Sequence, residues 1–355
     1  MTVFYTTLVS TFILGIYSRM TEIRNKRVGM MFAFFAMIII VLVSGLRSNI
    51  GDTGAYMHSY KQLSTFSNFT EDMKDKGFML FQLILYNTNQ DPQFFVFVTS
   101  VITQICVMYG LYKYRSYYEL EVYMYITSGM FLTVMNGIRQ AMVGAILFFC
   151  TKLIIDNKFI PYAIIVLILS TMHESALIMI PVYFIARQES WSKNTLIIII
   201  IASIGFVFFY QLIPSFFSLL GASSYTEYAD SMMQAGIGCS FTRVLVNAVP
   251  VILSYRYRNK LKETWSESNI FINMSLINLI IMAFALYNWI FARFGIYFQF
   301  YNMVLLPYII KNCFEEKKEK RLIYYLFIVF YFVFFYYEQV IVGVGLGYRS
   351  DFFSL

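Results

Sequence analysis

The chain has 355 residues, of which 59% are hydrophobic, 19% aromatic and only 13% charged. A soluble domain carries roughly 25% charged residues, so this composition excludes an ordinary soluble protein and predicts an integral membrane protein. The formal net charge of +7 does not indicate nucleic-acid binding, because the lysines and arginines lie mostly in short connections, where they set the orientation of the spans.

The apolar runs do not alternate in polarity, which favours helical spans over barrel strands. In chain order we expect helical runs over residues 3–18, 29–46, 93–112, 122–155, 159–186, 195–212, 241–255, 269–288, 295–310 and 322–342. The fourth and fifth runs are each predicted to be two short helices, which gives about twelve spans in a single multi-span domain over residues 1–355. Short or broken spans are tolerated where their backbone lines a cavity. The sequence therefore predicts an all-α polytopic bundle with an outward-facing cavity.

Basic clusters give the orientation of these spans. Lysines and arginines gather at residues 19–27, 256–262 and 311–321, and such clusters favour the cytoplasmic side. The segments near 47–92 and 213–240 are then external. Within the first of them, the apolar run from Phe78 to Tyr86 predicts a short interfacial helix. Asp91-Pro92 predicts the start of the following helix, because proline suits a first helical turn.

The first polar site follows the second apolar run, in the glycine-rich stretch from Gly45 to Tyr56. It places Arg47 and Asp52 five residues apart at the mouth of a membrane helix. Arg47 is a candidate anion-binding group, and its alternative is an arginine that snorkels at a helix end. Asp52 is a candidate general base, and its alternative is a helix cap, for which its side-chain oxygen is favoured.

Two further polar sites interrupt apolar runs. Asn136-Gly137 breaks the run 122–155 and leaves Arg139 and Gln140 at the junction; the alternative is an arginine in a tight external turn. His173 and Glu174 lie at the predicted outer turn of residues 159–186 and are candidates for the site. Their alternative role is only to form hydrogen bonds with the backbone groups at a helix end. On insertion scales, placing a charged side chain at the membrane centre costs about 2.5–3.5 kcal/mol of free energy. Because Arg139 lies between two apolar runs, this cost indicates that it has a function.

The last two polar sites lie near the C-terminus. Arg293 has Trp289, Tyr297 and Tyr301 at steps of four, which predicts a stripe on one helical face. That stripe suits a sugar whose charged group the arginine holds, and it also suits an aromatic belt with a cation–π contact. Glu338 is a carboxylate near the outer end of the last span, where an ionisable residue is functional by default.

Together these sites predict an anion-binding surface outside the membrane. Arginines in an apolar setting hold phosphates through their planar fork and permanent charge. A diphosphate-linked sugar on a polyprenol fits a ligand that is both anionic and lipid-borne. No cofactor is expected, and no metal, because no Cys/His spacing suits zinc and the sequence contains no glycine-rich phosphate loop.

With these motifs the chain resembles the EpsG-like and Wzy-like bacterial polysaccharide polymerases, which are similar in architecture to membrane glycosyltransferases of the GT-C class. The resemblance covers most of the length as a pattern of spans. It rests on these short motifs: Gly45-Leu46-Arg47, Gly51-Asp52-Thr53 with Tyr56, Ile138-Arg139-Gln140, His173-x-Ser175-Ala176-Leu177, and Arg293 with Tyr297-Phe298.

The resemblance implies glycosyl transfer on the outer face of a bacterial cytoplasmic membrane. Polyprenyl-diphosphate-linked repeat units would be donor and acceptor, in an exopolysaccharide, capsule or O-antigen system with flippase and chain-length regulator proteins as partners. Arg139, Arg293 and Arg47 would stabilise the departing diphosphate. Asp52 is the first candidate for the general base and His173 the second. The predicted substrate-binding residues are Gln140, Glu174, Trp289, Tyr297, Tyr301 and Glu338.

Three other classes stay open. A lipid-linked oligosaccharide flippase would also have many spans and cationic cavity residues, but should carry charges deep in the spans and an internal repeat. A membrane O-acyltransferase would place its histidine in a cytoplasmic or mid-membrane tunnel, whereas His173 is predicted to be external. A non-catalytic assembly partner is the third class.

Overall fold

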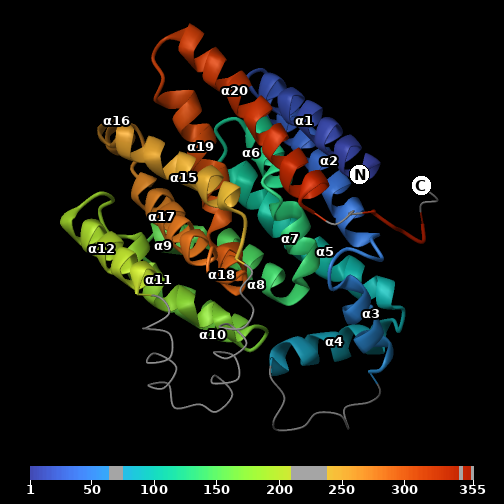
Figure 1. Ribbon diagram of the computed structural model, residues 1–355. Helices are drawn as coiled ribbons and strands as arrows, with labels where there is room; N and C mark the ends of the chain where they lie inside the picture. Colours follow the sequence, from blue (N-terminus) through green and yellow to red (C-terminus); the bar gives the residue numbers. More distant parts are fainter. Residues whose placement is uncertain (64–74, 209–237, 344–346, 353–355) are drawn as a thin grey trace. The chain divides into compact units, whose positions relative to one another are not determined.

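A computed structural model describes residues 1–63, 75–208, 238–343 and 347–352 of the chain. The described residues form helices joined by short connections (Figure 1). They belong to two compact units: unit 1 contains Met1–Tyr183 and Ile310–Leu355, and unit 2 contains Phe184–Ile309. Most of the predicted external segment 213–240 lies outside the described residues.

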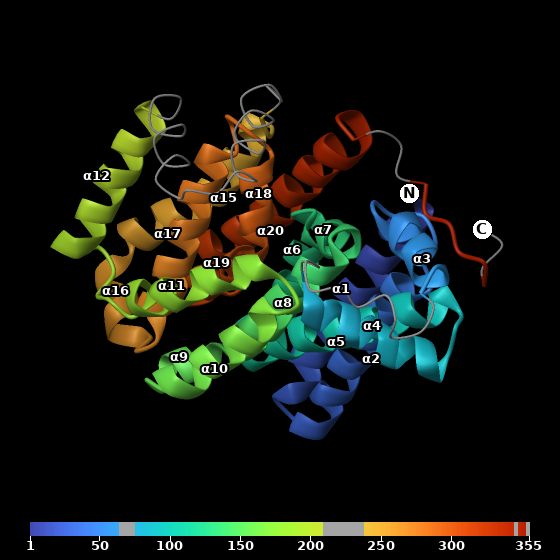
Figure 2. The ribbon, with the colours of Figure 1, turned by 90° about the horizontal axis from the view of Figure 1, so that it is seen from below.

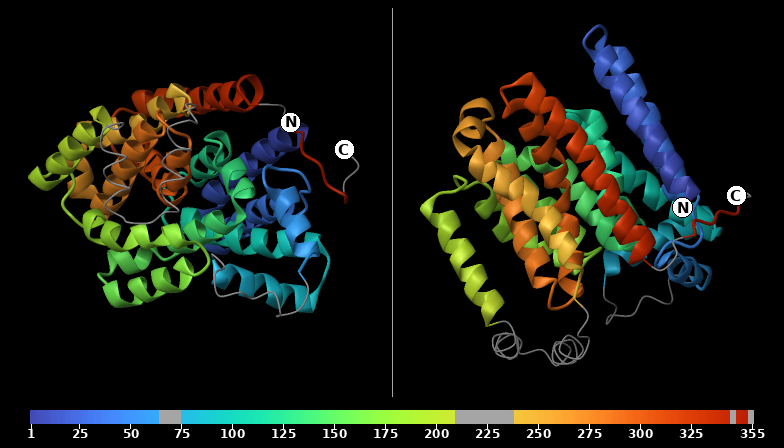
Figure 3. Two further views of the ribbon diagram at one scale, coloured as in Figure 1. Left: turned by 60° about the horizontal axis from the view of Figure 1, so that its bottom comes forward. Right: turned by 45° about the horizontal axis from the view of Figure 1, so that its top comes forward.

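Unit 1 begins with a hairpin of two long helices, α1 (Thr2–Glu22) and α2 (Lys26–Gly45), which lie side by side in Figure 3. Asn25 caps the second helix, because its side chain accepts hydrogen bonds from the backbone N–H groups of Arg27 and Val28. The hydroxyl of Ser18 donates to the carbonyl of Gly29 across the turn at 2.8 Å. The predicted spans at residues 3–18 and 29–46 thus form helices that pack tightly against each other.

The segment after this hairpin contains two short helices and one long one: α3 (Thr53–Lys61), α4 (Lys76–Thr88) and α5 (Pro92–Lys113). The short helix expected over Phe78–Tyr86 is confirmed as α4. The predicted helix start at Asp91-Pro92 is confirmed too, since the Asp91 carboxylate accepts a hydrogen bond of 2.9 Å from the backbone N–H of Gln93. Both α3 and α4 contact α5.

The remaining helices of unit 1 are mostly short. The predicted break at Asn136-Gly137 is confirmed, because α7 ends at Asn136 and α8 begins at Ile138. The predicted turn at His173 lies between α10 and η2. The helices in order are α6 (Tyr118–Thr127), α7 (Met130–Asn136), α8 (Ile138–Phe149), α9 (Thr151–Ile155), α10 (Phe159–Ser170), η2 (Glu174–Ile178), α11 (Met179–Ala186), α20 (Lys317–Tyr336) and the π-helical turn η4 (Tyr337–Ile341). The end of α11 belongs to unit 2.

Unit 2 is built around α17, which contacts both α12 and α15 (Figure 2). Its centre is polar: the side-chain amides of Asn278 and Asn302 both donate to the Asn247 oxygen, at 2.7 and 2.8 Å, and all three side chains are buried. The elements of unit 2 are α12 (Lys193–Val207), α15 (Phe241–Arg256), α16 (Arg258–Thr264), α17 (Ser268–Phe284), α18 (Ile290–Phe294), η3 (Gly295–Tyr297) and most of α19 (Gln299–Asn312).

Three described helices are long and apolar enough to cross a membrane by themselves: Lys26–Gly45, Pro92–Lys113 and Lys317–Ile341. Shorter apolar helices accompany them in both units. Because roughly 20 residues are needed for a full crossing, the shorter ones would cross only when packed in protein. The all-helical membrane class is therefore supported, while the number of about twelve spans and the outward-facing cavity stay predictions.

Candidate functional site

The turn that carries Asp52 is held by Asn136, which ends α7. The backbone N–H of Asp52 donates to the Asn136 side-chain oxygen at 2.8 Å. Gly51 makes this approach possible: its φ is +52°, and a Cβ there would lie 2.1 Å from the same oxygen. Only glycine adopts this conformation at no steric cost. The Gly51-Asp52 motif and the Asn136-Gly137 break, 84 residues apart, are thus one structural feature.

Asp52 itself lies directly before α3, at the position of a helix cap. Its carboxylate makes no capping hydrogen bond, and the residue is exposed. The capping alternative therefore does not account for this side chain. Asp52 lies one turn before Tyr56, whose hydroxyl accepts a hydrogen bond from the guanidinium of Arg139.

Arg139 lies in the first turn of α8 and is surrounded by groups from two other segments, α3 and the start of α4. Its Nη1 forms an ion pair of 2.5 Å with the Asp75 carboxylate, and its Nε donates to the Tyr56 hydroxyl at 3.3 Å. The guanidinium carbon lies 5.7 Å from the centre of the Phe78 ring. The side chain keeps 39% of its surface exposed, so these contacts leave part of it accessible.

Asp75 is the residue of this cluster that sequence reasoning missed. It directly precedes α4 in a left-handed backbone conformation, with φ at 57°. Non-glycine residues held in this region cost of order 1–3 kcal/mol and gather at functional sites. One signal was available: an aspartate three residues before the apolar run that begins at Phe78 is typical of a helix start. Nothing in the sequence paired it with Arg139.

The turn that carries His173 joins the same cluster through α4. The backbone N–H of Gly77 donates to the Thr171 carbonyl at 2.8 Å. Farther along the turn, the Ser175 hydroxyl lies 3.5 Å from His173 Nδ1 and also 3.5 Å from Gln140 Nε2. His173 is half-buried, whereas Glu174 is exposed. The structure therefore brings Asp52, Arg139, Gln140 and His173 into one polar cluster of unit 1.

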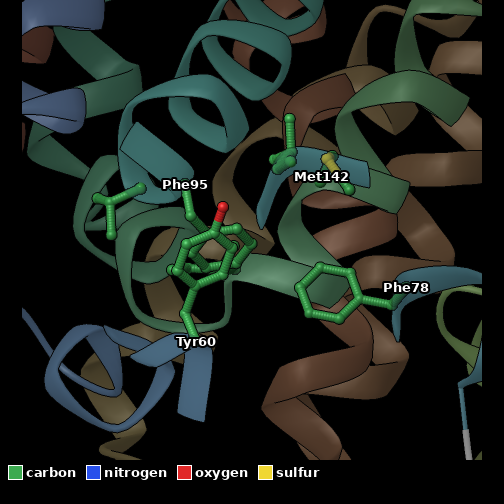
Figure 4. Packing of buried hydrophobic residues seen from close by; sticks show 7 residues of the cluster. Tyr60, Phe78, Phe95 and Met142 are labelled. Carbon is green, nitrogen blue, oxygen red and sulfur yellow. The ribbon is translucent and has the colours of Figure 1, made fainter. Parts of the chain in front are cut away.

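A hydrophobic cluster of residues from α3, α4, α5 and α8 is drawn in Figure 4. The rings of Tyr60 and Phe95 stack with centroids 5.0 Å apart, and Phe78 meets Phe95 edge-on at 6.0 Å. Met142, one turn after Arg139 on α8, belongs to the same cluster. Tyr56 packs against it through its ring while its hydroxyl accepts from Arg139. Because α3, α4, α5 and α8 share this cluster, they hold the polar side chains on rigid elements.

Arg47 has a different environment from the one expected. Its side chain is 1% exposed, so the snorkelling alternative is wrong. Its Nε donates to the Thr53 hydroxyl at 3.0 Å, Nη1 to the Ser100 hydroxyl at 2.8 Å and Nη2 to the Met135 carbonyl at 2.7 Å. Since all three nitrogens contact protein atoms, we infer that Arg47 positions the Asp52 turn against the end of α7. Its predicted role in holding diphosphate has no support in this geometry.

This placement predicts a large effect of Arg47 on stability. Arg47→Ala should lower the free energy of unfolding by on the order of 3 kcal/mol, because hydrogen bonds to charged groups contribute about 1.5–3 kcal/mol each and buried acceptors lose their donor. Thermal unfolding of the detergent-purified protein measures the change. Arg24→Ala, an exposed arginine in the α1–α2 turn, is the matched control. Equal melting temperatures for the two variants would refute the positioning role.

The predicted aromatic stripe around Arg293 is only partly present. Arg293 lies 4.7 Å above the ring of Trp289, and both are exposed. The prediction that Tyr297 and Tyr301 continue this face on one helix is wrong, because α18 ends at Phe294 and the turn η3 precedes α19. Both tyrosines are buried instead.

Close packing accounts for this break. A Cβ at Gly295 would lie 2.4 Å from the Met282 side chain and 3.3 Å from the Asn278 oxygen, so the turn is pressed against α17. Arg293 and its aromatic neighbours belong to unit 2, and their predicted participation in the Arg139 cluster stays a prediction. Glu338 is buried in η4 of unit 1, and its predicted role likewise stays a prediction.

Comparison with known proteins adds the family. A sequence model of the EpsG family matches residues 4–348. The chain belongs to the EpsG family. The match spans both units and every motif named above, so the predicted resemblance to EpsG-like proteins is confirmed. Membership in the EpsG family, together with the apolar helices, indicates a membrane protein of polysaccharide synthesis. No curated protein and no solved structure matches the chain.

Proposed function

We propose that this EpsG-family protein is a polysaccharide polymerase, which joins polyprenyl-diphosphate-linked oligosaccharide repeat units on the outer face of a bacterial cytoplasmic membrane. The observation that carries the proposal is the cluster around Arg139. A partly exposed guanidinium, an exposed carboxylate and a histidine turn meet there from four segments of unit 1. Acid–base groups beside a fixed arginine suit a reaction whose leaving group is a phosphate.

The reaction is a glycosyl transfer between two lipid-linked glycans. A hydroxyl oxygen of the acceptor repeat attacks the anomeric carbon of the donor chain, and the bond from that carbon to the diphosphate oxygen breaks. The bonding electrons remain on the lipid diphosphate, and the hydroxyl proton passes to a base. The products are a chain longer by one repeat and a free polyprenyl diphosphate.

Arg139 stabilises the leaving group in this scheme. Charge develops on the bridging diphosphate oxygen, and a preorganised donor aimed at that charge is usually the largest catalytic contribution. Asp75 and Tyr56 hold the guanidinium on one side through Nη1 and Nε. The guanidinium therefore does not need to reorganise when the diphosphate binds. Arg293, exposed above Trp289 in unit 2, is a second candidate for diphosphate or sugar binding.

Asp52 serves as the base for the acceptor hydroxyl. Its carboxylate is exposed and makes no capping bond, and Asn136 fixes its backbone. His173 is the second candidate, oriented by Ser175, which also contacts Gln140. Base catalysis of this kind typically contributes 10²–10⁴-fold to the rate. Substitution of the residue that acts as the base should therefore lower the rate by this factor, which distinguishes Asp52 from His173.

The experiment that tests the function is removal of the gene from its host. Lipid-linked single repeat units should accumulate and polymer should disappear, and expression of the full chain should restore long polymer. Gel analysis of the polymer and mass spectrometry of the lipid extract give both quantities. Repeat units that accumulate only in the inner leaflet would indicate a flippase. Unchanged polymer length would contradict a polymerase.

A further inference from the structure

A second polar site of unit 1 lies away from the Arg139 cluster. A pocket with a volume of about 790 Å³ opens between the end of α1, the connection after α5 and the end of α19. Arg19, Arg115 and Lys311 line it, with Glu22 as the one carboxylate among its lining residues. The site therefore has an excess of positive charge. Nothing in the proposed polymerisation uses it.

The cations of this pocket are held in place by protein contacts. Arg19 forms an ion pair of 3.0 Å with the buried Glu119, and its guanidinium lies 4.8 Å above the Tyr117 ring. Lys311 Nζ donates to the Ser116 carbonyl at 3.0 Å, and it lies 5.7 Å from the same ring. Both cations therefore contact the ring of Tyr117, which also lines the pocket.

Arg115 is the third cation of the pocket. It pairs with both carboxylate oxygens of Glu22 and lies over the Tyr112 ring, with its guanidinium carbon 3.7 Å from the ring centre. The carboxylate of Glu22 neutralises one of the three cations. Glu119 pairs with Arg19 in the same way, so Lys311, whose Nζ contacts the Ser116 carbonyl, supplies the net positive charge that an anion would meet, with Arg19 as a second donor.

Exposed apolar side chains next to the pocket indicate which kind of anion it binds. Four exposed apolar side chains follow one face of α1 at helical spacing and lead to the pocket: Val9, Ile13, Tyr17 and Met20. Ile23, which also lines the pocket, is exposed as well. In a membrane protein such a stripe faces acyl chains. An apolar track that ends in a cationic pocket suits a molecule with a phosphate at the end of a hydrocarbon chain.

We propose that this pocket binds the headgroup of an anionic phospholipid, with its phosphate between Arg19 and Lys311 and an acyl chain along the exposed stripe of α1. Basic pockets between membrane helices on the cytoplasmic side bind anionic headgroups in this way. The basic α1–α2 turn, which contains Arg24, Lys26 and Arg27, lies at the same end of α1. The site is independent of the polymerase proposal.

The test measures lipid retained by the full-length protein. The protein is incorporated in vesicles of equal parts phosphatidylglycerol and phosphatidylcholine, extracted, and its bound lipids are quantified by mass spectrometry. Phosphatidylglycerol should be enriched in the wild type. Lys311→Gln should reduce that enrichment about fivefold, the effect of one basic group near an anionic surface, and Lys311→Arg should retain it. Lys311 is exposed, so these variants are expected to fold.

Lys318→Gln is the matched control, because it removes the same charge from an exposed site at the start of α20, outside the pocket. Enrichment preserved in this control and lost in Lys311→Gln supports the site. Equal loss in both variants would show a general surface attraction and overturn it, as would equal retention of the two lipids by the wild type. If the purified wild type binds inorganic phosphate but retains no excess of phosphatidylglycerol, the pocket takes a free anion and the lipid assignment is wrong.

Discussion

Asp52→Asn should stop chain growth and leave single repeat units on the lipid carrier. The amide keeps the size of the carboxylate but cannot accept the acceptor's hydroxyl proton. The backbone hydrogen bond to Asn136 is unaffected by the change, so the turn should keep its conformation. The expected loss of polymerisation rate is about 10²–10⁴-fold, the usual contribution of a general base.

The measurement is the length distribution of polymer in a deletion strain that expresses each variant at matched membrane levels. Asp156→Asn is the control, because it makes the same change at an exposed aspartate whose carboxylate pairs with Lys152 after α9. If Asp52→Asn polymerises at the parent rate while His173→Ala does not, the base is His173. If both variants polymerise normally, neither residue is the base.

Arg139→Lys should lose most of the polymer although the positive charge remains. A lysine is a compact charge without the planar fork, and it cannot contact Asp75, Tyr56 and a diphosphate at once. Removal of one donor aimed at developing negative charge costs about 10²–10³-fold in rate. Arg139→Ala should be at least as defective.

The same polymer assay, with membrane abundance measured by immunoblot, separates this loss from failed insertion. Arg24→Lys is the control for the chemical change. Asp75→Asn should be milder than Arg139→Ala, because Tyr56 still orients the guanidinium. Full activity of Arg139→Lys would rule out a geometric role and leave Arg139 with a role in charge alone.

Local signals explain which parts of the fold were predictable. Asp91-Pro92 begins α5, Asn136-Gly137 separates α7 from α8, and His173 lies in the turn before η2. In each case a few consecutive residues determine the feature through a cap, a missing N–H or a flexible backbone. Two of these breaks also supply the polar cluster: Asn136 holds the backbone of Asp52, and Gln140, next to Arg139, contacts Ser175 of the His173 turn.

Contacts between distant segments explain what could not be predicted. Arg139 pairs with Asp75, 64 residues earlier, and no local pattern indicates this partner. Arg47 looks like an exposed cation at a helix end, yet Ser100 and Met135 bury it. The stripe from Trp289 to Tyr301 has helical spacing, but α18 ends at Phe294 and Gly295 packs closely against Met282. Tertiary packing decided all three cases.

The most direct measurement uses the purified full-length protein in vesicles with an isolated lipid-linked repeat unit as its only substrate. We predict that the wild type lengthens the glycan and releases polyprenyl diphosphate in equal amounts, and that Arg139→Lys and Asp52→Asn do neither at a measurable rate. Transfer of the repeat unit between leaflets without any lengthening, or lengthening that is unchanged in both variants, would contradict a polymerase whose chemistry is carried by the Arg139 cluster.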